Sequence, residues 1–336
     1  MPAHKLDADM QAWMQDQAVA AAGYPPIRLE VPLDPHRVVN DALAMRMAGG
    51  GPVMEESADR WVFARGRRIQ CRVHRPLQGA MPQGTVPQGT VQGAGPAAPA
   101  LVYFHGGGWV WASIDTHDRL MREYAAGGGV TVVGVDYALS PEAKFPQAIE
   151  ECAAVVRWLA EHGSAWGIDG TRLLLGGDSA GGNLALATAL LLRDQGGPAA
   201  RGILASYPVC DSRLDTPSYR DYGSGLGLTT EKMAFYWSVY VPHAADRLHP
   251  LAAPLRADLA GLPPVRLQIA ECDVLRGECE ALDRKLRAAG VVVETDLYTG
   301  VVHGFVRCTD SVEKARAAMD ATNDWLRRMA APGQTG

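Results

Sequence analysis

The sequence predicts an α/β fold in which a mostly parallel sheet is covered by helices on both faces. From residue 100 onward, short apolar runs alternate with amphipathic stretches, as strands and helices do in such folds. The 336 residues include 47% hydrophobic and 21% charged residues, which indicates a globular protein and excludes wholesale disorder. Consecutive parallel strands are then expected to be joined by right-handed crossovers.

The first elements differ from this alternation. Residues 5–50 are expected to be helical with a break at Tyr24-Pro25-Pro26, because proline removes a backbone donor and restricts the residue before it. Two alternating segments, 61–64 and 69–73, are expected to form antiparallel strands joined at Arg65-Gly66. Further strands are expected at 100–104, 130–135, 173–175, 203–206, 265–270 and 291–297, and helices at 145–161, 180–193, 278–289 and 311–329.

Two segments interrupt the predicted pattern. Residues 78–99 consist almost wholly of Gly, Pro, Ala, Gln, Thr and Val, and contain Pro-Gln-Gly-Thr-Val twice in tandem. Such a segment buries too little apolar surface to offset its ordering entropy, so we expect a disordered loop insertion. Residues 211–248 are rich in aromatic residues and helix-like, and an insertion there would lie over the strand ends, where α/β sheets bind ligands.

Charge and composition exclude several classes of function. The net charge of −5 leaves no basic surface for nucleic acid, so no nucleic-acid partner is expected. No apolar run approaches the ~18 residues of a membrane span, and the first residues lack the core of a signal peptide. The six cysteines form no Cys-x-x-Cys pair and are expected to be reduced thiols in a cytoplasmic protein. No Cys/His cluster suggests a metal, and no cofactor is expected.

The strongest local motif is Gly177-Asp178-Ser179-Ala180-Gly181, between a predicted strand and a predicted helix. In that context, Gly-x-Ser-x-Gly places the serine on a sharp strand-to-helix turn, where small neighbours let the backbone crowd together. The N–H groups at the start of the helix then point at an oxyanion that forms beside the serine. The simpler alternative is a glycine-rich turn that begins a helix.

A second motif, His105-Gly106-Gly107-Gly108-Trp109, follows the strand that ends at Phe104. Three consecutive glycines let the backbone approach a ligand and expose its N–H groups. Alone this could be a flexible turn. Upstream of a Gly-x-Ser-x-Gly sequence, it matches the oxyanion loop of lipases and esterases, with His105 and Gly106 supporting the loop.

A serine hydroxyl needs a base, and the chain has nine histidines. His303 lies between the strand 291–297 and the last helix, where the order serine, acid, histidine requires it. Asp273 directly follows the preceding strand, and this position favours it as the acid over its neighbours Glu271 and Glu278. The histidines expected to be surface or cap residues are His117, His243 and His249.

Together the motifs resemble the hormone-sensitive-lipase family of α/β-hydrolases, and within it the bacterial acetyl esterases. The resemblance covers roughly residues 60–330 outside the insertion, and it implies an α/β-hydrolase fold with a helical cap. Further matching segments are 113–119, 136–142, 145–151, 177–183, 261–264 and His303-Gly304-Phe305. One departure is Asp273-Val274-Leu275, where the family usually has Asp-Pro-Leu. Proline only stiffens that turn, so we expect the acid to be kept.

The resemblance implies a serine carboxylesterase that hydrolyses short-chain esters, from acetyl to hexanoyl, through an acyl-enzyme. The implied roles are nucleophile for Ser179, acid for Asp273 and base for His303. The implied oxyanion hole consists of the backbone amides of Gly107, Gly108 and Ala180. The implied domains are a cap of residues 1–50 and 211–248, a catalytic domain of residues 51–210 and 249–331, and a tail of residues 332–336.

Aromatic residues near these motifs are candidate walls of the substrate pocket, with packing in the cap or core as the alternative. A bulky Trp109 beside the glycine loop would exclude long acyl chains. The other candidates are Trp111, Tyr207, Phe235, Tyr236 and Trp237.

Other functions remain open at this level. The same machinery could act on an amide, a lactone or an acetylated sugar, or the fold could bind a ligand without catalysis. An interfacial lipase is disfavoured, because residues 211–248 contain no long apolar lid. The expected partner is a small ester substrate. The strand 291–297, as a sheet edge, could also pair with a second copy in a homodimer.

Overall fold

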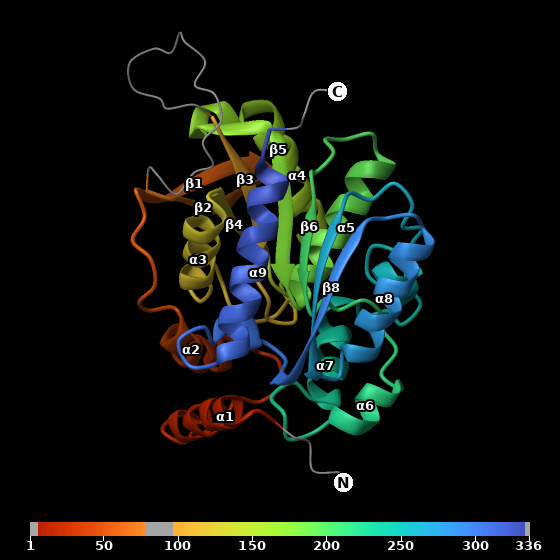
Figure 1. Ribbon diagram of the computed structural model, residues 1–336. Helices are drawn as coiled ribbons and strands as arrows, with labels where there is room; N and C mark the ends of the chain where they lie inside the picture. Colours follow the sequence, from red (N-terminus) through yellow and green to blue (C-terminus); the bar gives the residue numbers. More distant parts are fainter. Residues whose placement is uncertain (1–5, 78–96, 333–336) are drawn as a thin grey trace.

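The computed structural model describes residues 6–77 and 97–332, which build one eight-stranded sheet between two layers of helices (Figure 1). The strand order is β1-β2-β4-β3-β5-β6-β7-β8. β1 pairs with β2 and β2 with β4 in antiparallel fashion, and all other neighbours are parallel. The strands are β1 Glu56–Ala64, β2 Arg67–Arg75, β3 Ala98–Phe104, β4 Thr131–Asp136, β5 Ile168–Asp178, β6 Ile203–Ser206, β7 Val265–Cys272 and β8 Val293–Val302. The predicted fold class is therefore confirmed.

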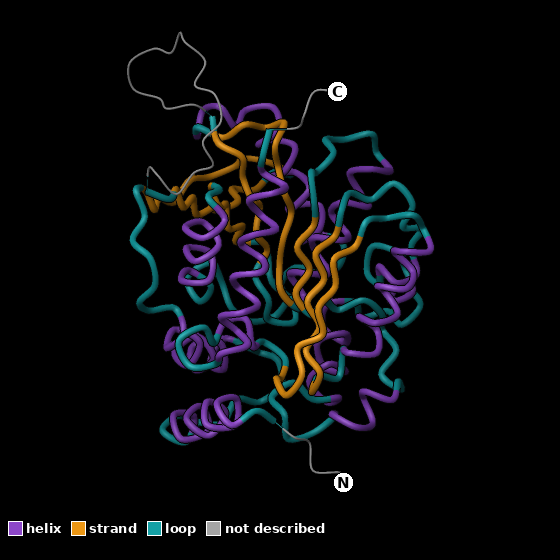
Figure 2. The backbone as a smooth tube through the Cα atoms, viewed as in Figure 1, coloured by secondary structure: helices purple, strands orange, loops and turns teal. Residues whose placement is uncertain are grey.

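Helices cover both faces of this sheet (Figures 1 and 2). α3 and α9 pack together on one face, and α4, α5 and α8 cover the other. α1, α2, α6 and α7 lie beyond the carboxyl ends of the parallel strands (Figure 1). The helices are α1 Ala8–Ala21, α2 Asp34–Ala44, α3 Asp118–Gly128, α4 Gln147–His162, α5 Ala180–Asp194, α6 Pro217–Tyr222, α7 Thr230–Tyr240, α8 Arg276–Ala288 and α9 Glu313–Ala330.

The central strands are buried on both sides, which explains why they appear in the sequence as continuous apolar runs. All residues of β3 are buried. Successive residues of β3 belong to different clusters, with Leu101 packed in the layer of α3 and α9 and Val102 in the layer of α4 and α5. Leu174 and Leu175 of β5 divide in the same way. Two apolar layers therefore hold the sheet in place.

The predicted strands and helices are confirmed, but the sequence analysis missed one helix and predicted several strands too short, including β1 and β2. β5 runs from Ile168 to Asp178, and β8 continues to Val302. α3 is absent from the predicted elements because it ends in a run of glycines, which disfavour helix. Packing explains why it forms, since a Cβ at Gly127 would overlap Asn323 of α9.

The predictions for the two segments that interrupt the pattern, residues 78–99 and 211–248, compare differently with the structure. The tandem repeat lies in residues 78–96, outside the described residues, while Ala98 and Pro99 belong to β3 rather than to the predicted loop. The predicted tail falls almost entirely on residues 333–336, also outside the described part. Residues 211–248 contain α6 and α7, and the break at Pro25-Pro26 lies between α1 and α2. No described helix has the length and apolar character that crossing a membrane requires.

Candidate active site

Ser179 occupies the turn between β5 and α5 with φ 55° and ψ −119°. A positive φ is unfavourable for a residue other than glycine and persists only where the surroundings impose it. The flanking glycines show how tight the turn is. A Cβ at Gly181 would overlap the carbonyl oxygen of Phe104, and one at Gly177 would overlap the backbone of Gly181. The motif is therefore a packing requirement of this turn.

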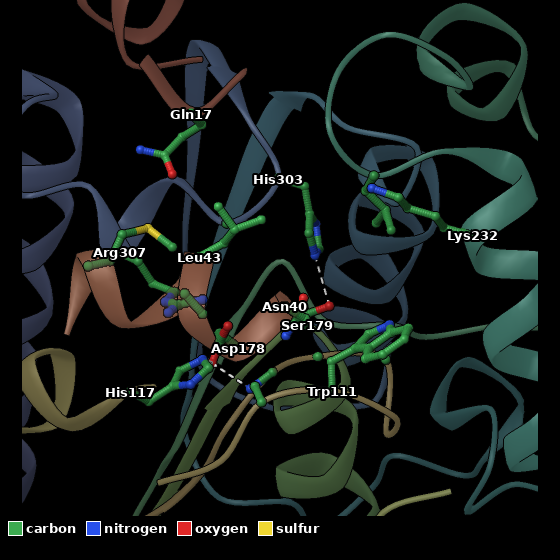
Figure 3. Close-up of a pocket in the computed structure, with 18 of the residues that line it drawn as sticks. Gln17, Asn40, Leu43, Trp111, His117, Asp178, Ser179, Lys232, His303 and Arg307 are labelled. Carbon is green, nitrogen blue, oxygen red and sulfur yellow. Dashed lines mark hydrogen bonds and ion pairs between the residues drawn. The ribbon is translucent and has the colours of Figure 1, made fainter. Parts of the chain in front are cut away.

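The structure brings Ser179, His303 and Asp273 into one line of hydrogen bonds. His303 Nε2 lies 2.8 Å from Ser179 Oγ (Figure 3). His303 Nδ1 lies 2.6 Å from Asp273 Oδ2. Each residue directly follows a strand, namely β5, β7 and β8. These parallel strands end at the same edge of the sheet, which is why residues far apart in the sequence meet.

Asp273 is 2% exposed, and its second oxygen accepts a hydrogen bond of 3.0 Å from the N–H of Leu275. This bond closes the turn in which valine replaces the family's proline. Glu271 instead accepts from Gly300 N, and the buried Glu278 accepts from Cys210 N. Burial raises the pKa of Glu278 well above its usual range. Neither glutamate has a hydrogen bond to His303 in the described structure.

The glycine loop after β3 is tied to the residue before the serine. Asp178 Oδ1 accepts hydrogen bonds from Gly106 N at 3.0 Å and from Tyr103 Oη at 2.7 Å. The backbone N–H groups of Gly107 and Gly108 donate to no other described residue. The N–H of Ala180, the first residue of α5, has no acceptor within the helix. Three free N–H groups thus lie in the segments that flank Ser179.

The loop also needs glycine for space. Gly107 and Gly108 have φ angles of 124° and 62°, which side-chain-bearing residues rarely adopt. A Cβ at Gly108 would overlap the ring of Tyr236 in α7. His105 supports the loop through Nδ1, which donates to Gly106 O at 2.8 Å, and its ring stacks on Tyr137 with centroids 4.3 Å apart.

His117 is not a surface or cap residue, contrary to the prediction. It is 1% exposed, and its Nε2 lies 3.4 Å from Asp178 Oδ1 beneath the glycine loop. Burial lowers the pKa of His117, and it lowers the pKa of His105 to about 3. The ring of His105 is therefore neutral at pH 7. The clue in the sequence is Asp178 itself, a carboxylate at the end of a buried strand that requires polar partners.

A cavity of about 400 Å³ opens above Ser179 (Figure 3). Its walls come from the glycine loop, α1, α2 with the turn after it, α7 and the segment after β8. The wall residues that the sequence analysis did not assign to the pocket include Trp13, Gln17, Asn40, Leu43, Lys232 and Arg307. These belong to helices and loops whose packing over the sheet cannot be deduced from any local motif.

The six predicted aromatic walls divide into two groups, and Phe235, which is half-buried against the core, is one of those that do not line the cavity. Trp111 and Tyr236 line the cavity, and Trp111 Nε1 donates to Tyr236 Oη at 3.1 Å. Trp109, Tyr207 and Trp237 do not line it and are buried in packing. Trp109 stacks on Tyr240, and Tyr207 packs against the ring of His303 with centroids 4.7 Å apart. Trp109 therefore cannot exclude acyl chains, because the loop presents its backbone to the cavity and this side chain to the core.

A mostly parallel sheet with a serine, an imidazole and a carboxylate aligned at its carboxyl edge is the architecture of an α/β-hydrolase. Comparison with known proteins agrees. A family model described as alpha/beta hydrolase fold matches residues 101–307. An ethyl acetate hydrolase of Pseudomonas putida is 40% identical over 221 residues, which cover 65% of this chain and 70% of the relative.

An acetyl esterase of Salmonella schwarzengrund is 36% identical over 245 residues, covering 70% of this chain and 75% of the relative. Among solved structures, a thermostable esterase from Pseudomonas putida superposes with a TM-score of 0.87 at 35% identity, over 99% of this chain and 100% of that one. The chain belongs to the α/β-hydrolase family as a carboxylic ester hydrolase of the hormone-sensitive-lipase type.

The buried, neutral ring of His105 predicts how stability depends on pH. Between pH 6.5 and about 3, His105 binds a proton in the unfolded chain but not in the folded one. The unfolding free energy should therefore fall as the pH falls through this window, by about 1.4 kcal/mol per pH unit for such a group. Urea unfolding at pH 7.0, 5.5 and 4.5 would measure this slope. His105→Gln should reduce the slope by about one proton, and an unchanged slope would contradict the assignment.

Proposed function

We propose that this esterase hydrolyses short-chain acyl esters, from acetyl to hexanoyl, through an acyl-enzyme on Ser179. The observation that carries the proposal is the line of hydrogen bonds from Ser179 through His303 to Asp273, at the base of a cavity of about 400 Å³. Serine becomes an effective nucleophile when a base accepts its proton in this geometry.

In the first half of the proposed reaction, Ser179 Oγ attacks the ester carbonyl carbon while His303 Nε2 takes the hydroxyl proton. The carbonyl electron pair moves onto the oxygen, and the N–H groups of Gly107, Gly108 and Ala180 stabilise that negative charge. Asp273 stabilises the imidazolium that forms. The tetrahedral intermediate then breaks its bond to the alcohol oxygen, which takes the proton from His303.

The second half repeats these steps with water. His303 accepts a proton from a water molecule, whose oxygen attacks the acyl carbon bound to Ser179. The tetrahedral intermediate collapses, the bond to Ser179 Oγ breaks, and the serine takes its proton back from His303. The products are a carboxylic acid and the free enzyme.

The walls of the cavity support short acyl groups. Trp111 and Tyr236 are joined by a hydrogen bond and stand beside the glycine loop, and Leu43 contributes from α2. We propose that residues 1–50 and 211–248 act as a helical cap that closes the cavity from above, because α1, α2 and α7 all supply wall residues. We propose that a pocket closed in this way favours short acyl groups over long chains.

The proposal predicts a steep dependence on acyl length. Initial rates on p-nitrophenyl esters from acetate to laurate should fall beyond hexanoate, because the proposed cap helices and the pair Trp111–Tyr236 would limit the length of the acyl chain. Ser179→Ala should abolish the activity on every ester, since no acyl-enzyme can form. Efficient turnover of laurate would refute the small pocket, and serine-independent turnover would refute the mechanism.

Asp178 is proposed as a positioning residue that holds the oxyanion loop. Asp178→Asn removes the charge beside Gly106 N and should lower kcat by about 10–100-fold. This decrease does not exceed the decrease in kcat of about 10²–10³-fold that follows the removal of one oxyanion donor. KM should change little, because the cavity walls stay in place. Steady-state kinetics on p-nitrophenyl acetate would separate the two parameters. The variant Asp178→Glu keeps the charge. If it loses thermal stability together with kcat, the role of Asp178 is merely structural.

We also propose that β8, an edge strand, pairs with a second copy of the chain in a homodimer. Leu297 of β8 is 42% exposed, and an unpaired edge with exposed apolar residues favours such pairing. Light scattering should then give twice the chain mass of 35.9 kDa, and Leu297→Lys should return it to the single-chain value.

The proposed cytoplasmic location is supported by the six cysteines, all of which are buried free thiols.

A further inference from the structure

We propose that the cavity recognises a carboxylate on the substrate through Lys232, so that esters bearing a free acid group are the favoured class. This inference rests on the proposed function, because it specifies the substrate for the same site. It depends on one cationic side chain of α7 and on the charges around it.

Lys232 presents an incompletely used ammonium group to the cavity. The side chain is half-buried and lines the cavity wall, and Figure 3 shows it reaching from α7 toward the space beside His303. Its Nζ donates to the carbonyl oxygen of Gly227 at 2.7 Å. An ammonium has three donors, and no second acceptor for Lys232 Nζ exists in the described structure. Two N–H groups therefore remain for a ligand.

The charge of Lys232 is also poorly compensated. The carboxylate that acts on it is that of its exposed chain neighbour Glu231, and the two form no ion pair in the described structure. Burial lowers the pKa of Lys232, which reflects the cost of removing the ammonium from water. A bound carboxylate would offset that cost.

Its position in the helix adds a second unfavourable effect. Lys232 lies in the first turn of α7, where Thr229 caps the helix by accepting from Lys232 N at 3.2 Å. A cation near a helix N-terminus faces the positive end of the helix dipole, whereas an anion is stabilised there. A residue whose charge is unfavourable at its position in a helix is expected more often at a functional site than elsewhere in a protein.

The other cation of the cavity differs in its surroundings. Arg307 lines the opposite wall of the cavity from Lys232 (Figure 3). Its guanidinium donates to Thr116 O at 2.8 Å. Its positive charge helps to lower the pKa of Asp178, so Arg307 already has an anionic neighbour. Among the described residues that line the cavity, Asp178 is the one carboxylate, and it lies on the side of Arg307. Lys232 is thus the cation whose charge a substrate carboxylate would compensate.

The remaining walls near Lys232 are apolar or aromatic, including Leu228, Trp111 and Tyr236. They suit a short carbon spacer between the ester and the acid group. The acid could belong to the acyl part, as in a monoester of a dicarboxylic acid, or to the alcohol part, as in an acylated hydroxy acid. Both present the same carboxylate, so the test includes one pair of substrates for each.

The experiment compares each acid with its neutral amide. Monoethyl succinate is paired with ethyl succinamate, and acetoxyacetate with acetoxyacetamide, with released ethanol or acetate measured by coupled assays. In the wild type, kcat/KM should be higher for the acid than for the amide in at least one pair. Lys232→Met should lower this acid-to-amide ratio by about 10-fold or more, as expected for loss of a charge-assisted hydrogen bond.

Two further variants control for indirect effects. Lys232→Arg keeps the charge and should retain most of the ratio, while Lys144→Met, an exposed lysine at a separate groove, should leave the ratio as in wild type. Increasing salt should also reduce the ratio in the wild type. The inference would be overturned by equal rates on acid and amide in the wild type, or by equal losses on both in Lys232→Met. It would also be overturned if substitution of Arg307, and not of Lys232, lowered the acid-to-amide ratio. Loss of all serine-dependent hydrolysis would instead refute the proposed function.

Discussion

The close contact between the turn at Ser179 and the loop after β3 is the constraint on which the rest of the site depends. Gly181 lies directly against the carbonyl oxygen of Phe104, so neither segment can move without the other. The carboxylate of Asp178 reinforces this contact through Gly106 N. Because the interior of a protein is close-packed, a contact of this kind fixes the separation between Ser179 and the glycine loop.

Buried polar groups around this contact act on the carboxylate of Asp178. Although burial opposes ionisation of Asp178, the neighbouring His117, Arg307 and Tyr103 lower its pKa well below the ordinary value. An ionised carboxylate in this position can hold the backbone N–H of the loop as well as a tyrosine hydroxyl. The electrostatic arrangement therefore preorganises the loop before any substrate binds, which is the condition for efficient stabilisation of an oxyanion.

Local motifs explain why much of the fold and the centre of the site could be predicted. Gly-x-Ser-x-Gly encodes a turn whose geometry depends on residues adjacent in sequence, and Asp273 and His303 each directly follow a strand. Predictions that depended on which way a side chain points were less successful. Trp109 and Trp111 are two residues apart in one loop, yet only Trp111 reaches the cavity. The positive φ of Trp109, 61°, belongs to a turn that sends its ring toward Tyr240.

The sequence by itself determined the class of fold, the order of its strands, and the residues that meet at the carboxyl edge of the sheet. It could do so because periodicity and short motifs report on backbone conformation over a few residues. Only the tertiary structure decided that α3 forms despite its glycines, that His117 lies buried beside Asp178, and that Lys232 faces the cavity. Those outcomes depend on packing between segments far apart in the chain, where burial and neighbouring charge outweigh local preference.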